Sequence, residues 1–327
     1  MRLPVMAKLL IIGKMPPPVG GVSMHVKRLT QSLRRLGFDF DFCDPGKSSV
    51  FKILRQIATH RIIHIHFSNP AVQVVSAIFC RLTYKKLIIT YHGCWGRYGA
   101  LGNRAVELSA HIAHVPIVQE RASLLQALRC NPRSREVSTY IADPEIQPLP
   151  ASLKSEIASR RKHYQATFCT NAWNVTSDKN GREIYGITEM VDRFHEYPEY
   201  QLLISDPSGN YRSYIQKYNP HISNNIFFIS HLHDFKSILL LSDAFIRNTT
   251  TDGVSLSIHE ARDLGISILA SAAVERPPFC SIFYDFSKTD LKEKLEEAER
   301  LIALPVEASD TVARLIELYQ DIERNLR

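Results

Sequence analysis

The chain has 327 residues, of which 45% are hydrophobic and 22% are charged, as in soluble globular proteins, and its length allows two ordinary domains. No stretch approaches 18 uninterrupted apolar residues, which argues against a membrane-spanning helix, and the N-terminus lacks the pattern of a signal peptide. Six cysteines are scattered without a C-x-x-C pair, so we expect reduced cytosolic thiols and neither a zinc site nor a disulfide framework.

Charge divides unevenly between the two halves of the chain. Residues 1–150 carry 20 Lys and Arg against 8 Asp and Glu, whereas residues 151–327 carry 20 against 25. A basic half beside a mildly acidic one suggests that the first half meets an anionic partner. No nucleic-acid-binding motif accompanies the charge, so we expect no nucleic-acid partner. A basic surface without any partner remains the alternative.

The first half predicts alternating strands and helices. It opens with a buried strand, 8–13, a loop with Gly20 and Gly21, and a helix, 23–36, that stops at Gly37. Paired glycines let backbone N–H groups approach a ligand beside a helix N-terminus, although such a pair usually marks only a turn. Further strands are expected at 38–42, 61–67, 87–92, 115–118 and 136–141, with helices at 53–57 and 120–128.

Three histidines stand near the ends of these strands. His64 and His66 share one side of their strand because side chains alternate with period two. No nearby carboxylate or cysteine completes a metal set, so we interpret both as satisfied polar groups and expect no metal. His92 precedes Gly93 and is either a contact to a ligand or a structural residue. The loop 94–99, with its aromatic and basic side chains, is the expected specificity loop.

Prolines 144, 148 and 150 indicate a linker to a second domain. The domain is expected to contain strands at 166–173, 200–205, 226–229, 244–246 and 266–270 and helices at 152–164, 184–197, 211–218, 233–241 and 290–303, and a last helix of the chain is expected at 309–326. This succession predicts a second doubly wound sheet.

The most informative segment runs from residue 244 to residue 278. It reads as strand, loop, helix and strand, and open α/β sheets bind ligands at the loop that such a unit forms. Asp252 lies in the loop and Glu260 lies in the helix, which we expect to begin near Ser255. Both acids can accept hydrogen bonds from a hydroxylated ligand, while the helix N-terminus offers N–H groups to a phosphate. The plainer interpretation is that Asp252 caps the helix and Glu260 is solvated.

This segment resembles the acidic signature of GT-B glycosyltransferases, in particular the retaining enzymes of family 4. Asp252-Gly253 stands at the first Glu-Gly pair of that signature and Glu260-Ala261 at the second Glu-Ala, with the tail formed by Leu264-Gly265 and Leu269-Ala270-Ser271. The chain departs from the family at Asp252, at Val254-Ser255, which replaces Phe-Gly, and at Ser267, which replaces Pro. The Gly-Arg that usually follows the first strand of the second domain is absent, and Asn171-Ala172-Trp173-Asn174 occupies the region.

The resemblance implies the roles of the site residues. Asp252, Glu260 and His92 would be the catalytic set: Asp252 contacts the donor sugar, Glu260 holds the ribose, and His92 faces the acceptor. A fixed cation is needed where no metal offsets the charge on a departing nucleotide diphosphate. The expected donor-binding residues are Gly20, Gly21, Lys179, Arg182, Arg247, Gly253, Val254, Ser255 and Leu256.

The resemblance also implies an α/β fold of the GT-B type, with two Rossmann-like doubly wound domains facing a cleft and a last helix that crosses back to the first domain. The boundaries are expected at 1–148, completed by about 309–327, and at 149–308. The implied function is transfer of a sugar from a UDP- or GDP-sugar to a glycan or lipid-pyrophosphate-linked acceptor, without a cofactor or metal and with retention, in surface polysaccharide (lipopolysaccharide) biosynthesis. The protein would be cytoplasmic, with possible peripheral contact between its basic half and an anionic membrane.

Two alternatives stay open. A sugar-nucleotide 2-epimerase would use the same architecture but needs a further acid/base set, which the sequence does not reveal. A nucleotide-sugar-binding subunit without turnover is compatible with the missing Gly-Arg.

Overall fold

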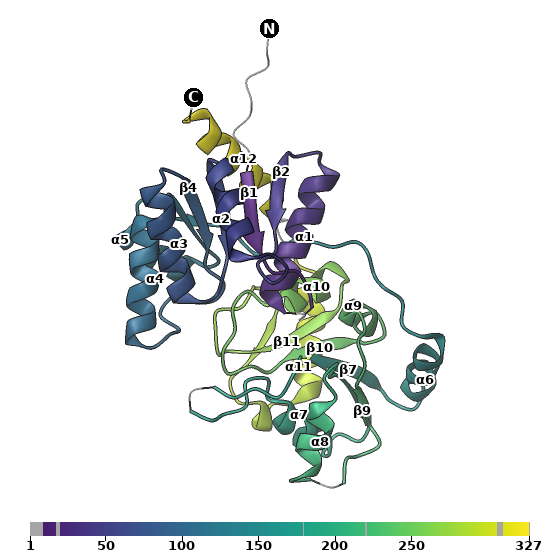
Figure 1. The fold of residues 1–327 in the computed structure, drawn as a ribbon. Coiled ribbons are helices and arrows are strands. Elements are labelled where there is room, and N and C mark those ends of the chain that lie inside the picture. Colours follow the sequence, from purple (N-terminus) through teal and green to yellow (C-terminus); the bar gives the residue numbers. More distant parts are fainter. Residues whose placement is uncertain (1–8, 18–19, 179, 220, 306–309, 327) are drawn as a thin grey trace. The chain divides into compact units, whose positions relative to one another are not determined.

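The computed structural model describes residues 9–17, 20–178, 180–219, 221–305 and 310–326 (Figure 1). The chain divides into two compact units, one formed by Met1–Ile141 with Ala308–Arg327 and the other by Ala142–Glu307. Each unit contains a six-stranded sheet whose paired strands run parallel, with helices between successive strands. The predicted pair of doubly wound α/β sheets is therefore confirmed.

The sheet of the first unit has the strand order β2-β1-β3-β4-β5-β6. Its strands are β1 (Leu9–Gly13), β2 (Phe40–Cys43), β3 (Ile62–His66), β4 (Lys86–Thr90), β5 (Val115–Val118) and β6 (Arg135–Glu136). Its helices are α1 (Gly21–Arg35), α2 (Val50–Thr59), α3 (Pro70–Leu82), α4 (Ala100–Ile112), α5 (Arg121–Cys130) and α12 (Thr311–Arg324).

Side-chain alternation along β1 gives this sheet two apolar faces. Leu10 and Ile12 pack in one cluster with residues of α2, α3, α4 and α5. Leu9 and Ile11 pack on the other face in a cluster with residues of α1 and α12. The last helix of the chain thus completes the core of the first unit, where Tyr319 is buried.

Three predictions for this unit were incomplete or wrong. Helices α3 and α4 were not predicted, because apolar side chains on both the core side and the outer side of each helix blur the helical period. The α3 start nevertheless carries a recognisable signal, since Asn69 accepts hydrogen bonds from Ala71 N and Val72 N and Pro70 follows it. The strand predicted at 136–141 is wrong beyond Glu136. There the carbonyls of Thr139 and Ile141 accept hydrogen bonds from side chains of α1 instead of joining a ladder.

The sheet of the second unit has the order β12-β11-β10-β7-β8-β9. Its strands are β7 (Ala166–Asn171), β8 (Tyr200–Ser205), β9 (Ile226–Ile229), β10 (Ala244–Arg247), β11 (Ser267–Ser271) and β12 (Ser281–Phe283). Its helices are α6 (Ala151–Arg161), α7 (Ile187–Phe194), α8 (Asn210–Gln216), α9 (Phe235–Leu239), α10 (Leu256–Asp263) and α11 (Leu291–Ile302), with a 3-10 turn at Phe286–Lys288.

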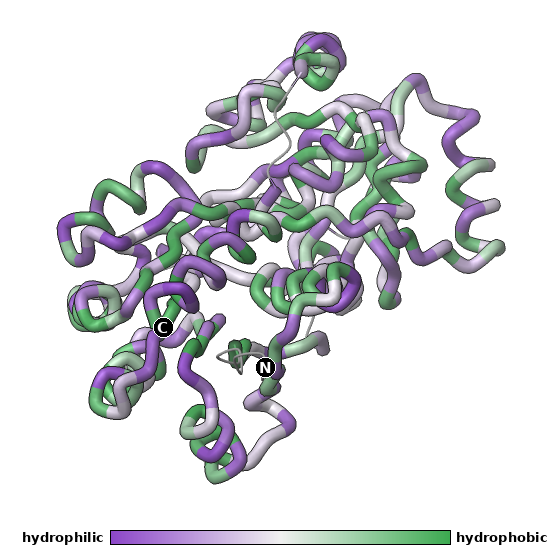
Figure 2. Tube along the Cα trace, turned by 90° about the horizontal axis from the view of Figure 1, so that it is seen from above, coloured by the Kyte–Doolittle hydropathy of each residue, from purple (hydrophilic) through white to green (hydrophobic). Residues whose placement is uncertain are grey.

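Two apolar clusters cover the faces of this second sheet. Phe168 of β7 belongs to the cluster that α7, α8 and α11 complete, whereas its neighbour Cys169 belongs to the cluster of α6, α9 and α10. The hydropathy colouring in Figure 2 shows that hydrophilic and hydrophobic residues alternate along the traces of the helices, as in amphipathic helices. Within the described ranges, no helix combines the length and apolar character that crossing a bilayer requires.

Candidate functional site

The second sheet changes direction of winding between β10 and β7, the two central strands. Helices that leave these strands at their carboxyl ends go to opposite faces of the sheet, and open α/β sheets bind ligands at such a point. Three polar residues end the strands there, namely Asn171 on β7, Arg247 on β10 and Ser271 on β11.

An ion cluster of Arg247, Asp252 and Arg276 occupies this edge of the second sheet. Arg247 donates through Nε and Nη2 to both carboxylate oxygens of Asp252, at 2.9 and 3.0 Å. Arg276 donates through Nη1 to Asp252 Oδ2 at 3.0 Å. Only 12% of the Arg247 side chain, 10% of the Asp252 side chain and 2% of the Arg276 side chain are exposed. These are buried charges in fixed geometry and not surface ion pairs.

Neighbouring polar groups fix the two guanidinium groups. Arg276 donates through Nε to the carbonyl of Ser271 at 3.0 Å and through Nη2 to Thr249 Oγ1 at 2.9 Å. Arg247 donates through Nη1 to Asn171 Oδ1 at 3.4 Å, and its guanidinium carbon lies 5.4 Å from the ring centroid of Tyr185. The cations are consequently held in place before any ligand arrives.

The electrostatics of the cluster favour an anion. Burial opposes ionisation of Asp252, but Arg247 and Arg276 outweigh it and hold the pKa of the carboxyl below its usual value. Burial likewise works against the charged form of Arg247, and Asp252 overcomes it, so that the pKa of the guanidinium is raised. At neutral pH two positive charges therefore face one negative charge, which leaves a net positive charge in a largely buried site.

The first turn of α10 adjoins the ion cluster. Asn171, which accepts from Arg247, donates through Nδ2 to Ser257 Oγ at 2.8 Å. Ser255 is the N-cap residue, yet its side chain makes no capping hydrogen bond, and its buried Oγ has no hydrogen-bond partner among the described residues. The first N–H groups of a helix lack intrahelical partners and carry partial positive charge. A fixed cationic cluster, a helix N-terminus and an unpartnered hydroxyl are features with which proteins bind anions.

A second polar group of residues lies in the first unit, at the point where its strand order reverses between β1 and β3. Four buried imidazoles meet there: His25 of α1, His64 and His66 of β3, and His92 after β4. The ring centroid of His66 lies 5.1 Å from that of His25, 4.2 Å from that of His64 and 5.5 Å from that of His92. We call these four residues the histidine cluster.

Hydrogen bonds assign tautomers within the histidine cluster. Gln119 Nε2 donates to the carbonyl of Tyr91 and faces His92 Nδ1 at 3.4 Å, so this nitrogen of His92 accepts. His92 Nε2 must then carry the proton, and it donates to His66 Nδ1 at 3.2 Å. His66 Nε2 therefore also carries a proton, and it has no acceptor among the described residues. The chain of bonds makes each of these rings a neutral, oriented imidazole.

Burial keeps the histidine cluster neutral. Desolvation, helped by the neighbouring imidazoles and by Arg28 or Arg97, lowers the pKa of His25 to about 4 and that of His64 to about 3, and it lowers the pKa values of His66 and His92 well below the ordinary value. His64 is bonded at both nitrogens, to Tyr319 and Thr90, which agrees with its interpretation as a satisfied polar group. Within the described part of the chain, no group of three or more His, Cys, Asp or Glu side chains has the arrangement of a metal site.

No protein-family model and no curated protein matches the sequence. Solved structures match the fold over nearly its whole length. HepE from Anabaena, in complex with UDP-glucose, gives a TM-score of 0.68 at 13% identity and covers 98% of this chain and 99% of its own. The glycosyltransferase from Rickettsia africae gives 0.66 at 14% identity, with 97% and 99% covered. The sucrose-phosphate synthase from Thermosynechococcus elongatus gives 0.68 at 12% identity, with 96% and 99% covered. The chain has the GT-B fold.

Within this GT-B chain, the structure brings several predicted donor-site residues together. Arg247, Gly253, Ser255 and Leu256 lie at the ion cluster or on the adjoining start of α10, and the helix begins where the sequence predicted it. Val254 lies in the same loop, between Gly253 and Ser255. Glu260 lies on α10 and is partly buried. Its assignment to the ribose stays a prediction.

The sugar contact predicted for Asp252 stays a prediction. Both of its oxygens already accept hydrogen bonds from arginines, and Thr249 Oγ1 adds a longer one at 3.5 Å. The plainer alternative, a helix cap, fails, because the N-cap residue is Ser255. Arg276 was missed by the sequence reasoning. The available signal was a basic residue shortly after a buried strand, on the same sheet edge as Asp252.

Two other basic candidates are not part of the ion cluster as the structure describes it. Arg182 is 65% exposed and pairs with Asp178 in a local turn, with Nε and Oδ2 separated by 3.1 Å. Lys179 lies outside the described residues. In the first unit, Gly20 is the N-cap of α1, and a Cβ added to it or to Gly21 would meet no described atom within 4 Å. Internal packing therefore does not explain either glycine.

Proposed function

We propose that the protein is a glycosyltransferase that binds a nucleotide-sugar donor on its second unit, with the diphosphate at the ion cluster and the N-terminus of α10. The observation that carries the proposal is the buried pair Arg247 and Arg276, fixed by one shared carboxylate at the carboxyl ends of β10 and β11. The GT-B fold and the UDP-glucose complex of HepE support a UDP-sugar as the first donor to test, with a GDP-sugar as the next.

The arginines perform the main catalytic task in this proposal. When the bond between the anomeric carbon and the diphosphate breaks, negative charge grows on the departing nucleotide diphosphate. Preorganised guanidinium groups and helix N–H groups stabilise that charge without a metal ion or cofactor, because they need no reorientation as it develops. Asp252 acts through the cations that it orients. Arg247 and Arg276 supply the positive charge that the missing Gly-Arg motif would provide, and Asp252 is the positioning residue that holds them in place.

The remaining roles follow the family resemblance and are part of the same proposal. Glu260 binds the ribose, the backbone of Gly253 to Leu256 contacts the diphosphate, and Gly20, Gly21 and His92 contribute from the first unit. Transfer proceeds with retention of anomeric configuration to a glycan or lipid-pyrophosphate-linked acceptor in surface polysaccharide synthesis. The neutral imidazole of His92 suits a hydrogen-bonding contact with a sugar hydroxyl and not charge pairing with a phosphate, because burial disfavours its protonated form.

The test is calorimetric titration with UDP-, GDP- and ADP-sugars, with free UDP, and with uridine. Arg276→Gln and Arg247→Gln each leave the other arginine paired with Asp252, so we expect at least tenfold weaker UDP binding, corresponding to about 1.4 kcal/mol or more. Arg160→Gln, on α6 beside the amino end of β7, is the charge-matched control in the same unit, and its binding should equal that of the parent. Uridine, which lacks the diphosphate, should respond little to any of the three. Parent-like UDP binding by both cluster variants would refute the site.

Turnover of a labelled donor separates the remaining alternatives. Transfer to an acceptor, or slow hydrolysis of the donor, indicates the glycosyltransferase. Binding without either indicates a nucleotide-sugar-binding subunit, and a C2 epimer that forms without acceptor indicates an epimerase.

A further inference from the structure

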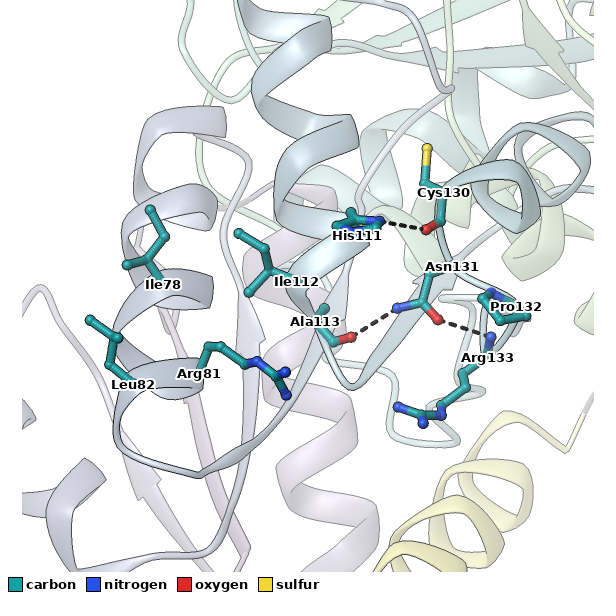
Figure 3. Close-up of a pocket in the computed structure, with 10 residues that line it drawn as sticks. All are labelled: Ile78, Arg81, Leu82, His111, Ile112, Ala113, Cys130, Asn131, Pro132 and Arg133. Carbon is teal, nitrogen blue, oxygen red and sulfur yellow. Dashed lines mark hydrogen bonds between the residues drawn. The ribbon is translucent and has the colours of Figure 1, made fainter.

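An open cavity of about 540 Å³ lies on the first unit, and none of the residues that line it belongs to either candidate site (Figure 3). Its walls are the last turns of α3 and α4 and the segment that follows α5. These helix ends lead into the amino ends of β4 and β5, whereas His92 and the histidine cluster lie at the carboxyl ends of their strands. The cavity is therefore on the opposite edge of the sheet from the histidine cluster.

Hydrogen bonds hold Asn131 and His111 in place beside the cavity. Asn131, which is 5% exposed, donates through Nδ2 to the carbonyls of Ala110 and Ala113 at 2.9 and 2.8 Å and accepts from Arg133 N. The ring of His111 hydrogen-bonds the carbonyl of Cys130 at 3.2 Å. Carbonyls at a helix C-terminus normally repel an anion. Here Asn131 and His111 occupy carbonyls at the ends of α4 and α5, which weakens that repulsion.

The cavity is basic. Figure 3 shows Arg81 extending from α3 and Arg133 from the opposite wall, with both guanidinium groups directed toward the space between them. Among the residues that line it, none is an aspartate or a glutamate. The charge of the surrounding sequence has the same sign, because the chain carries nine Lys and Arg and no Asp or Glu between Asp44 and Glu107. The cavity therefore favours an anionic occupant.

A row of exposed aliphatic side chains leads to the cavity along α3. Val72, Val75, Ile78 and Leu82 are 39, 67, 43 and 72% exposed, and their spacing of three, three and four residues places them on one side of the helix. The opposite side of α3 packs into the core through small residues such as Ala77. Ile78 and Leu82 also line the cavity, so the aliphatic row and the two arginines meet there.

We propose that this surface, which we call the α3 face, docks the protein onto an anionic lipid bilayer, with a lipid phosphate between Arg81 and Arg133. The aliphatic row of α3 then lies at the boundary between head groups and acyl chains, which is the usual arrangement of an interfacial helix. A basic group near an anionic membrane surface adds attraction that salt screens. A second copy of this chain does not fit as well, because its α3 face would bring the same positive charge.

The α3 face does not depend on the donor site, and the two proposals fail separately. If the acceptor is lipid-linked, docking would hold the protein at the surface that carries it. UDP binding measured on every α3-face variant should equal that of the parent. If neither the parent nor the α3-face variants bind UDP, the donor proposal is contradicted and the vesicle result is unaffected.

The test is sedimentation of the full chain with phosphatidylcholine vesicles and with vesicles of phosphatidylcholine mixed with phosphatidylglycerol. The parent should bind the mixed vesicles and bind the neutral ones much more weakly. The double variant R81Q/R133Q should lose about 25-fold in partition coefficient, since each basic group contributes about fivefold. The double variant R34Q/R35Q removes the same charge from α1, on the other face of the sheet, and should bind like the parent.

A second pair of variants tests the aliphatic row. I78S/L82S should weaken binding to the mixed vesicles at both low and high salt, whereas the loss in R81Q/R133Q should shrink at high salt. The substituted positions of the α3 face, 78, 81, 82 and 133, are all exposed. Circular dichroism and thermal unfolding establish that each variant is folded. Equal binding to neutral and mixed vesicles, equal losses in the α3-face and α1 variants, or a dimer that I78S/L82S dissociates would each overturn the proposal.

Discussion

Acidification should destabilise the first unit through its histidine cluster. Each of the four imidazoles has a lowered pKa in the folded state, about 4 for His25 and about 3 for His64. The unfolded chain, with a histidine pKa near 6.5, therefore binds more protons than the folded chain below that pH. The stability of the folded state with these imidazoles buried and neutral is fully present above pH 6.5. It is lost as the pH falls toward the folded-state pKa values.

The magnitude at pH 5 follows from the unfolded state. A histidine with a pKa of 6.5 favours its protonated form about 30-fold at pH 5, which is worth about 2 kcal/mol when the folded form stays neutral. This figure hardly depends on how far the folded pKa is lowered, provided that it lies at 4 or below. His25 and His64 together would lower the free energy of unfolding by about 4 kcal/mol, and the lowered pKa values of His66 and His92 act in the same direction. This loss is a large part of the whole stability of an ordinary domain.

The assay is urea unfolding at pH 7.5, 6 and 5, followed by tryptophan fluorescence. The chain has two tryptophans, so in a Trp173→Phe background Trp95 reports on the first unit alone. His64→Gln should reduce the loss of stability between pH 7.5 and pH 5 by about 2 kcal/mol. His221→Gln, at an exposed position of the second unit, is the control and should leave that loss unchanged. A pH-independent unfolding free energy in the parent, or an equal loss in parent and His64→Gln, would refute the reasoning.

Three further predictions concern single contacts and are read by urea or thermal unfolding. Gly186→Ala should destabilise the second unit by about 1–3 kcal/mol, because Gly186 has a φ of +56° and a Cβ would lie 2.7 Å from the carbonyl oxygen of Asn248; an unchanged melting temperature would contradict it. Tyr319→Phe should cost about 1–3 kcal/mol, since it leaves His64 Nδ1 buried without its partner at 2.7 Å; a parent-like stability would argue against that bond. Asp252→Asn should cost about 3–5 kcal/mol, because it leaves two buried arginines without a counter-charge. A variant at least as stable as the parent would contradict this.

The periodicity of the sequence predicted most of the fold, because most strands are short apolar runs closed by turn residues. Gly37 and Gly265 mark the helix ends correctly, and both adopt the positive φ that a left-handed stop requires. Helices α3 and α4 escaped prediction for an identifiable reason. Their outer sides are apolar, so the contrast that reveals an amphipathic helix is weak. The same exposed apolar side chains of α3 are the basis for proposing the α3 face.

The candidate site was predictable in its position but not in its bonding. Residue spacing placed Asp252 and Ser255 at a strand-to-helix loop, and the structure has them there. Spacing could not reveal that Arg247, five residues earlier, and Arg276, 24 residues later, would both turn to Asp252. Such pairing depends on the order β11-β10-β7, which brings strand ends together that are distant in the sequence.

The central claim is that the second unit holds a nucleotide diphosphate at its ion cluster, and the most direct measurement is a crystal structure of the protein with UDP. The account predicts phosphate oxygens within about 3 Å of a guanidinium nitrogen of Arg247 or Arg276 and within hydrogen-bonding distance of Ser255 or the first N–H groups of α10. A UDP molecule whose phosphates contact neither arginine nor the start of α10 would contradict it.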